Sequence, residues 1–396
     1  MRIGLVSDWM THAGGAEAYM RTVREALRSA GHTVALFACG PRPDGSADYA
    51  VVTSDSMLAR AVLQMANPEV SQGLRTMVRE FRPDVVLVGH FAYHVSPHAL
   101  SALGDVPMVI YLMDYKSICP VGSKLLPNLS PCREDSGIVC MRRGCVSPPH
   151  WLRDRPRYAL IRRALARAAL VLTPSATLHR QLATAGIQTT VLPQPVPLPT
   201  SGFQRQPAHA PCFVYVGRLS REKGVPLLID AFMRVRRAYP DTSLRIAGDG
   251  PLQSELAGLV AATDGVALLG ALSPEQVEAE LSTAWALIAP SLWEEPFGLV
   301  ALEAIVRGVP VIASDTGGFT ETVVHGSTGL LFTTARVEAL TASLVSIASG
   351  TAFPGARIDE AFIAQARLTY TTNAHVHQLI EIFARVHRDR ALPASE

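Results

Sequence analysis

The chain has 396 residues, of which 48% are hydrophobic and 18% are charged, and its mean hydropathy is +0.20. This much apolar surface excludes a disordered chain, and the length suits two α/β domains better than one. A net charge of +2 without a concentrated basic face or a reading motif argues against a nucleic-acid binder.

The first residues enter an apolar strand directly, without the basic region and cleavage site of a leader. No apolar run approaches the roughly 18 residues of a membrane span. We therefore expect a cytoplasmic protein, and peripheral contact with the inner face of the membrane stays open.

Residues 1–192 alternate short runs rich in Val and Ile with segments of helical period. This alternation is typical of a parallel sheet covered by helices. The predicted strands are Ile3–Ser7, Thr33–Ala38, Asp84–Gly89, Val106–Leu112, Leu170–Pro174 and Thr189–Leu192. After the first strand, Gly14 and Gly15 open a helix that ends near Gly31. Glycines let a diphosphate approach the free N–H groups of a helix start, although a plain tight turn explains the pair equally well.

A cysteine-rich insertion occupies residues 115–150. Its four thiols are those of Cys119, Cys132, Cys140 and Cys145. Their spacing does not match a zinc ribbon, and a reducing compartment disfavours disulfides, but four thiols suffice for a structural zinc ion. Bound zinc and free thiols therefore both remain open.

Arginines are frequent beyond the insertion. They are Arg142, Arg143, Arg153, Arg155, Arg157, Arg162, Arg163 and Arg167. A solvated helix face is the usual explanation of such a run, and contact with anionic lipid or a polyprenyl-phosphate-linked acceptor is the alternative.

Residues 193–211 are rich in proline and lack periodicity, so we interpret them as an interdomain linker. A second alternating series follows over residues 212–370, and residues 371–396 form a C-terminal helix and tail. Its predicted strands are Cys212–Gly217, Ser243–Ala247, Val266–Leu269, Ala286–Ala289, Pro310–Ala313 and Gly329–Phe332. The pattern indicates two doubly wound domains, whose sheets in such folds open on one ligand cleft.

The first strand of the second series leads into a glycine-bounded loop from Gly217 to Gly224. It carries Arg218, which can fork onto phosphate oxygens, and Lys223, which can provide a point charge. Only three lysines occur in the chain, so a lysine here favours a function over a solvated loop.

Residues 295–303 form the most specific segment. Glu295 precedes a helix that begins at Gly298, and Glu303 lies inside it. Backbone N–H groups of Phe297, Gly298 and Leu299 suit an anion, and the two carboxylates suit sugar or ribose hydroxyls. Helix capping by surface glutamates would explain Glu295 but not Glu303.

Together with Gly248–Pro251, Gly308–Ser314, Gly317–Gly318 and Gly326–Leu331, these motifs resemble glycosyltransferase family 4 over nearly the whole chain. The resemblance implies a GT-B fold, with the C-terminal helix packing back on the N-terminal domain. It also implies a retaining transferase that moves a sugar from a nucleotide-diphosphate sugar to a hydroxyl of a glycan, a lipid-linked acceptor or a small molecule. Cell-surface polysaccharide or glycolipid synthesis is the usual context.

The resemblance also implies residue roles. Arg218, Lys223 and the Gly15 backbone would hold the diphosphate, and Glu303 would bind the ribose. Glu295, Phe297 and Gly298 would contact the sugar. Residues Gly270, Ala271 and Leu272 would line the base pocket. No metal would be required for the chemistry, because the two cations replace it.

One position departs from the family pattern. Met113 precedes Asp114 where relatives often have histidine, and Met cannot donate or accept a hydrogen bond comparably. His90 and His94, near the preceding strand end, are candidates to compensate. The departure keeps a catalytically silent donor-binding subunit open as an alternative, beside another GT-B enzyme such as a nucleotide-sugar epimerase.

Overall fold

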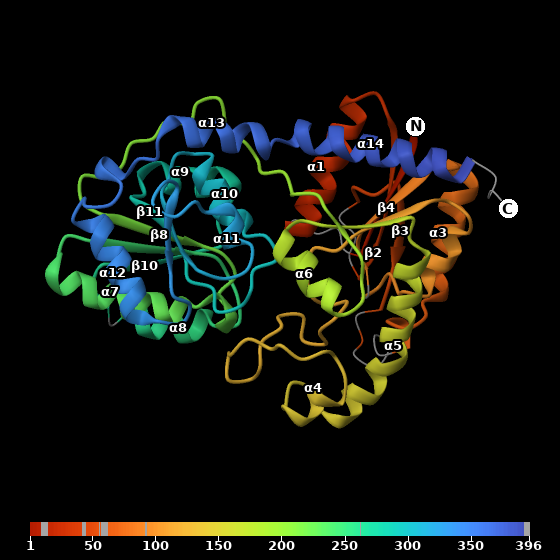
Figure 1. Cartoon of the computed structure of the whole chain (residues 1–396), viewed down its shortest axis with the longest axis horizontal. Coiled ribbons are helices and arrows are strands. Elements are labelled where there is room, and N and C mark those ends of the chain that lie inside the picture. The colour runs from red at the N-terminus through yellow and green to blue at the C-terminus, as the bar shows by residue number, and fades with distance from the viewer. Residues whose placement is uncertain are drawn as a thin grey trace. The chain divides into compact units, whose positions relative to one another are not determined.

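The computed structural model describes residues 1–8, 15–41, 45–54, 56, 62–91, 93–261 and 263–391. It divides into two compact units (Figure 1). The N-terminal unit comprises Met1–Pro127, Arg133–Pro195 and Thr372–Glu396, and the C-terminal unit comprises Asn128–Cys132 and Val196–Thr371.

The N-terminal unit is built on a parallel sheet with the strand order β3-β2-β1-β4-β5-β6-β7. Its strands are β1 (Arg2–Ser7), β2 (Thr33–Gly40), β3 (Tyr49–Val52), β4 (Val85–His90), β5 (Met108–Tyr111), β6 (Leu170–Thr173) and β7 (Thr190–Val191). The predicted parallel sheet is confirmed. The sequence did not predict β3, a four-residue edge strand whose side chains are alternately half-buried and exposed.

Helices cover this sheet. They are α1 (Gly15–Ser29), α3 (Pro68–Phe81), α5 (Pro148–Arg167), α6 (Ala176–Thr184) and α14 (Thr372–Ala391), and the short α4 (Ile138–Arg142) packs near α5. The C-terminal helix α14 lies beside α1, as Figure 1 shows, with Leu379 and Phe383 buried in the same core as Met20. Its His375 is hydrogen-bonded to the Tyr19 hydroxyl, 3.0 Å away, and to the Pro193 carbonyl, 2.7 Å away. The expected return of this helix to the N-terminal domain is confirmed.

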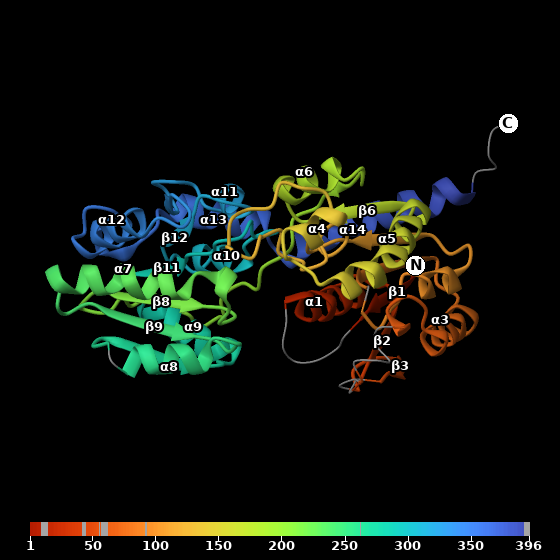
Figure 2. The ribbon, with the colours of Figure 1, turned by 90° about the horizontal axis from the view of Figure 1, so that it is seen from below.

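The C-terminal unit repeats the same plan with the order β10-β9-β8-β11-β12-β13, all parallel. Its strands are β8 (Cys212–Val216), β9 (Ser243–Ala247), β10 (Val266–Gly270), β11 (Ala286–Ala289), β12 (Val311–Ser314) and β13 (Gly329–Phe332). Helices lie on both faces of the sheet (Figure 2). They are α7 (Val225–Ala238), α8 (Gln253–Ala261), α9 (Pro274–Thr283), α10 (Leu299–Ile305), α11 (Phe319–Thr322), α12 (Val337–Ala348) and α13 (Glu360–Thr369).

The alternation of side chains along a strand explains the two cores of this unit. Phe213 and Tyr215 of β8 pack in the core with α7 and α12, whereas Cys212 and Val214 pack in the core with α9, α10 and α13. Both faces are covered, so most strand residues are apolar, with Arg245 of β9 as an exception that pairs with Glu280. None of the helices in the described ranges is long and apolar enough to cross a membrane.

Candidate functional site

The strand order of the C-terminal sheet reverses between β8 and β11, which pair side by side in parallel. In open parallel sheets, ligands bind at the carboxyl ends of the strands where the strand order reverses. The loop of residues 217–224 follows β8, and the loop of residues 290–298 follows β11. The two loops are linked by a hydrogen bond from the Leu292 amide to the Glu222 carbonyl, 2.7 Å long. The predicted cations and Glu295 therefore lie at one switch point.

Close backbone packing fixes the first of these loops. Gly248 has a φ of 139°, and a Cβ there would lie 1.8 Å from the carbonyl oxygen of Gly217. Only glycine lets the end of β9 approach so closely. Next to it, the Leu219 amide donates to the Asp249 carbonyl over 2.9 Å. Arg218 lies on this rigid loop with an exposed side chain, available to an anion.

Lys223 and Glu295 are in direct contact. The Lys223 Nζ lies 2.6 Å from the Glu295 Oε1, which also accepts a hydrogen bond from the Ser291 hydroxyl over 2.7 Å. The Lys223 Nζ is 5.1 Å from the centre of the Trp293 ring. The Lys223 side chain is 24% exposed and that of Glu295 is 9% exposed. The cation thus keeps a solvent-facing side from which it can reach a second anion.

The backbone around Glu295 is held by a glycine pair. The Gly318 amide donates to the Glu295 carbonyl over 2.7 Å, and a Cβ on Gly318 would lie 2.4 Å from the Phe297 carbonyl oxygen. The Phe297 ring itself is buried in the core, 6.0 Å from the ring of Tyr370. Its side chain therefore does not face the site, and only its backbone can contribute. Gly298 is the left-handed cap residue from which α10 starts at Leu299.

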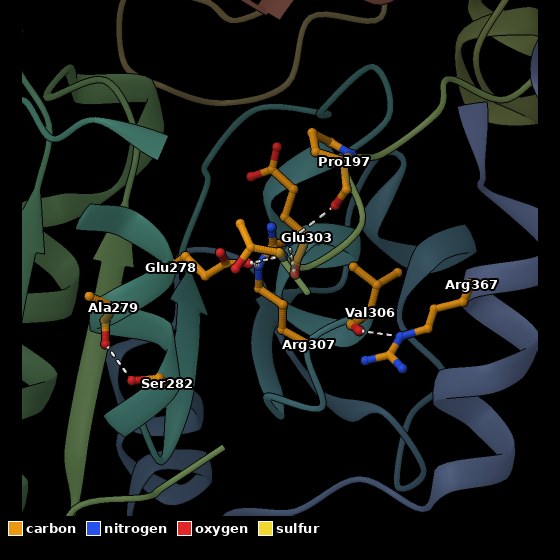
Figure 3. A network of polar contacts seen from close by, with 9 residues as sticks. Pro197, Glu278, Ala279, Ser282, Glu303, Val306, Arg307 and Arg367 are labelled. Carbon is orange, nitrogen blue, oxygen red and sulfur yellow. Dashed lines mark hydrogen bonds and ion pairs between the residues drawn. The ribbon is translucent and has the colours of Figure 1, made fainter. Parts of the chain in front are cut away.

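Glu303 has a different environment (Figure 3). The Arg307 guanidinium bonds to the Glu278 carboxylate over 3.0 Å and to the backbone carbonyls of Glu303 and Pro197, not to the Glu303 carboxylate. Among the residues that the structure describes, none donates a hydrogen bond to this carboxylate. Burial raises the pKa of Glu303, and the charge of Arg307 opposes only part of that rise. A partly buried carboxylate without a donor is suited to bind hydroxyl groups of a ligand.

The remaining predicted donor residues lie in both units. Gly270 ends β10 with a φ of 70° and accepts a hydrogen bond from the Gly248 amide through its carbonyl, 2.7 Å away, and Ala271 and Leu272 follow it. Gly14 lies outside the described residues. Gly15 is the exposed first residue of α1 in the N-terminal unit.

A second polar cluster lies in the N-terminal unit, at the carboxyl ends of the neighbouring strands β4 and β5. His90 and Lys116 each approach the Asp114 carboxylate to 3.6 Å. Burial acts to lower the pKa of His90, but the hydrogen bond to Asp114 and the charges of Asp8 and Asp114 outweigh it and raise the pKa. From the sequence, His90 was predicted only as a substitute for the missing family histidine, and the contact with Asp114 was missed. Lys116, another of the three lysines, is the residue that could have indicated a site here.

His94 has a different environment from His90. Its side chain is 1% exposed and its Nδ1 lies 2.7 Å from the Thr53 hydroxyl. The backbone amides of His94, Tyr93 and Val95 donate to the buried Asp8 carboxylate, the first two over 2.7 Å. His94 is therefore part of the structural core. Next to the cluster, the Gln194 amide donates to the Met113 sulfur, so Met113 helps to hold this strand end. Unlike a histidine, its thioether has no polar hydrogen to donate to a ligand.

The cysteines of the insertion are the candidate zinc ligands. Within the described ranges, which include Cys119, Cys132, Cys140 and Cys145, no three His, Cys, Asp or Glu side chains form a group that could hold a metal ion. Cys119 and Cys140 are buried, whereas Cys132 and Cys145 are half-buried, and Cys132 belongs to the C-terminal unit. Bound zinc in the insertion therefore stays a prediction, without a preformed group of ligands in the described ranges to support it.

Comparison with family models identifies both units. Residues 13–198 match the model of glycosyltransferase family 4, and residues 202–369 match that of glycosyl transferases group 1. Among curated proteins, a glycogen synthase of Mycobacterium tuberculosis is 39% identical over 169 residues, which are 42% of this chain and 40% of the relative. The alpha-D-kanosaminyltransferase of Streptomyces kanamyceticus is 35% identical over 124 residues, 31% of this chain and 32% of that one. The matches thus span less than half of either relative.

Solved structures share the fold over nearly the full length. Sucrose-phosphate synthase from Thermosynechococcus elongatus superposes with a TM-score of 0.75 at 22% identity, covering 98% of this chain and 99% of its own. Anabaena HepE in complex with UDP-glucose superposes with a TM-score of 0.71 at 20% identity, covering 97% and 100%. The two units together therefore form an α/β fold of the two-domain GT-B type.

Proposed function

Because the chain belongs to glycosyltransferase family 4, we propose that it transfers a sugar from a nucleotide-diphosphate sugar to an acceptor hydroxyl with retention of anomeric configuration. The observation that carries this proposal is the contrast within one motif of the C-terminal unit. Glu295 is bonded to Lys223, while the Glu303 carboxylate accepts no hydrogen bond from the residues that the structure describes.

Charged groups and hydroxyl groups of the donor determine how it binds. The diphosphate binds to the exposed Arg218 and to the solvent-facing side of Lys223, and these two cations neutralise the charge that develops on the leaving phosphate. The ribose hydroxyls donate to Glu303, and the base lies against residues 270–272 at the end of β10. HepE, solved with UDP-glucose and with UDP, supports a nucleotide sugar as the donor.

The transferred sugar lies next to Glu295. Its carboxylate accepts hydrogen bonds from the sugar hydroxyls and keeps the ammonium of Lys223 oriented toward the phosphate. The acceptor hydroxyl attacks on the face from which the phosphate departs, and its proton passes to that phosphate. The two cations thus provide the charge stabilisation, so we expect the chemistry to proceed without a divalent metal.

One observation favours a second candidate, a donor-binding subunit without activity. Met113 occupies the place of a family histidine, and its sulfur is engaged by Gln194. In the transferase, His90 would provide the polar group at this strand end. In the silent subunit, the nucleotide sugar would bind and remain intact.

The test is turnover of a panel of UDP, GDP and ADP sugars, with nucleotide release followed with and without acceptors, and with NMR of the product. An α-linked product from an α-linked donor, formed without a glycosyl adduct on Glu295 or Glu303, agrees with the proposal. A β-linked product or an adduct contradicts retention by front-face attack. A donor that binds but stays intact supports the silent subunit, and release of free nucleotide with an epimerised sugar supports the epimerase.

A further inference from the structure

A cavity of about 590 Å³ lies in the N-terminal unit, between the insertion and the Trp151–Arg162 stretch of α5. Its size falls within the range of small-molecule sites. Helix α4 packs near the start of α5, as Figure 1 shows, and Ile138 and Cys140 of α4 line the cavity. Neither the donor site nor the polar cluster at Asp114 contains these residues.

One face of α5 forms the cavity wall. Trp151, Arg155, Tyr158 and Arg162 recur at spacings of four, three and four residues, which places them on the same side of a helix. Arg155 lies with its guanidinium 5.3 Å from the centre of the Trp151 ring. Further along the same helix, Ile161, Ala164 and Leu165 are buried. The sequence thus assigns two arginines and two aromatic rings to the cavity side.

The cavity has an excess of positive charge. Its acidic residue Asp154 is neutralised by Arg153, 2.8 Å away, and by Arg157, 3.9 Å away. Arg155 and Arg162 are exposed, and within the described part of the chain neither forms an ion pair. Seven residues separate them, which corresponds to about 10 Å along the helix. Their long side chains can therefore converge on one anion between them.

The cavity also has apolar surface for a second part of a ligand. Ile138 and Val146 line it beside Trp151, and Ile138 is 45% exposed. Burial raises the pKa of the Tyr158 phenol, which therefore stays protonated. Its hydroxyl donates to the Lys116 carbonyl over 3.4 Å, so the cavity borders the segment that follows β5.

We infer that this cavity binds the acceptor substrate and that the acceptor is a phosphate ester. Its phosphate is held by Arg155 and Arg162, and its ring or chain lies against Trp151 and Ile138. Arginine guanidinium groups match phosphate oxygens in geometry, and an aromatic ring offers a flat apolar surface. This inference rests on the proposed function, because it names the chemistry of the acceptor.

The test compares benzyl phosphate with benzyl alcohol by NMR titration of the full chain without nucleotide. We expect benzyl phosphate to bind at least tenfold more tightly than benzyl alcohol. Arg155→Gln/Arg162→Gln should weaken benzyl phosphate at least tenfold. Trp151→Leu should weaken both probes. The matched control is Arg163→Gln, because Arg163 is the exposed neighbour of Arg162 and lines a different cavity.

A second arm separates a free phosphate ester from a lipid headgroup. The protein is sedimented with vesicles of phosphatidylcholine alone or with added phosphatidylglycerol. Binding to the anionic vesicles that depends on Arg155 and Arg162 identifies a lipid-linked ester, and absence of such binding identifies a soluble one. The inference is overturned if wild type does not prefer benzyl phosphate, or if Arg155→Gln/Arg162→Gln binds it as wild type does, or if Arg163→Gln loses as much.

These results are independent of donor chemistry. A protein that binds benzyl phosphate in this cavity but turns over no nucleotide sugar retains the site and contradicts the proposed function. A protein that turns over a nucleotide sugar but shows no phosphate preference here retains the function and contradicts the acceptor site.

Discussion

Two regions of the molecule contain an ion pair with a buried carboxylate, and they differ in how the pair is built. In the C-terminal unit, Lys223 and Glu295 come from two loops that leave neighbouring parallel strands, and the lysine is 24% exposed. In the N-terminal unit, Asp154 and Arg157 lie three residues apart in α5, and both side chains are less than 10% exposed.

This difference indicates different roles. A pair that joins two loops at the edge of a sheet can share its cation with an arriving anion, since one side of Lys223 faces solvent. A pair of two buried side chains within one helix mainly fixes that helix. The following variants test whether this distinction holds.

The largest effect is expected at Lys223. Lys223→Met should lower transfer at least about 100-fold, because it removes a charge-assisted contact to the diphosphate, and should destabilise the C-terminal unit by about 3 kcal/mol, because Glu295 is left without its cation. Lys223→Met/Glu295→Gln should recover most of that stability but not the transfer. Steady-state kinetics and thermal unfolding measure both quantities, with the exposed Arg221→Gln as the control. Recovery of transfer in the double variant would show that the pair is only structural.

Asp154→Asn should produce the opposite pattern. Loss of the carboxylate removes the negative charge beside the buried Arg157, so the free energy of unfolding should fall by about 3 kcal/mol, while nucleotide affinity stays unchanged. Hydrogen exchange in α5 and calorimetric titration with nucleotide measure the two effects. A drop in nucleotide affinity comparable to that of Lys223→Met would erase the distinction between the regions.

A smaller effect is expected at Glu303, whose carboxylate forms no ion pair with the described residues. Glu303→Gln should weaken nucleotide binding about tenfold, the equivalent of one hydrogen bond to a charged group. The raised pKa means that folding favours the protonated carboxyl, so the charge lowers stability at neutral pH. The variant should therefore unfold at a higher temperature than wild type. The exposed Glu255→Gln is the control, and reduced stability of Glu303→Gln would indicate a structural glutamate.

The same shift predicts a pH dependence. Because the pKa of Glu303 is raised, its carboxylate is lost at a higher pH than an ordinary glutamate as the solution is acidified. Nucleotide affinity of wild type should fall with decreasing pH through that range, and the affinity of Glu303→Gln should not. Parallel titrations of the two proteins at several pH values measure this, and identical pH profiles would contradict the assignment.

The sequence predicted much of the fold, because apolar runs buried on both faces are distinctive and the motif residues lie directly after them. β8, β11 and the loops bearing Lys223 and Glu295 could be placed in this way. The four-residue β3 could not, since an edge strand of that length carries too little pattern.

The contacts within the sites were less predictable. Nothing in the order of residues shows that Lys223 bonds to Glu295 or that Arg307 turns to Glu278 and leaves Glu303 without a donor. The cavity of the insertion was also missed, because it is enclosed by an irregular segment and a helix whose arginines look like a solvated face. Only the folded chain shows that the side of α5 with Trp151, Arg155 and Arg162 lines a cavity.

The central claim is that the C-terminal unit binds a nucleotide-diphosphate sugar through Lys223 and Glu303, each contacting a different part of the donor. Calorimetric titration of wild type, Lys223→Met/Glu295→Gln and Glu303→Gln with the matching nucleoside diphosphate and nucleoside tests it most directly. We predict that the Lys223 variant loses affinity for the diphosphate but not for the nucleoside, and that the Glu303 variant loses affinity for both. Equal affinities for both ligands in all three proteins would contradict the account.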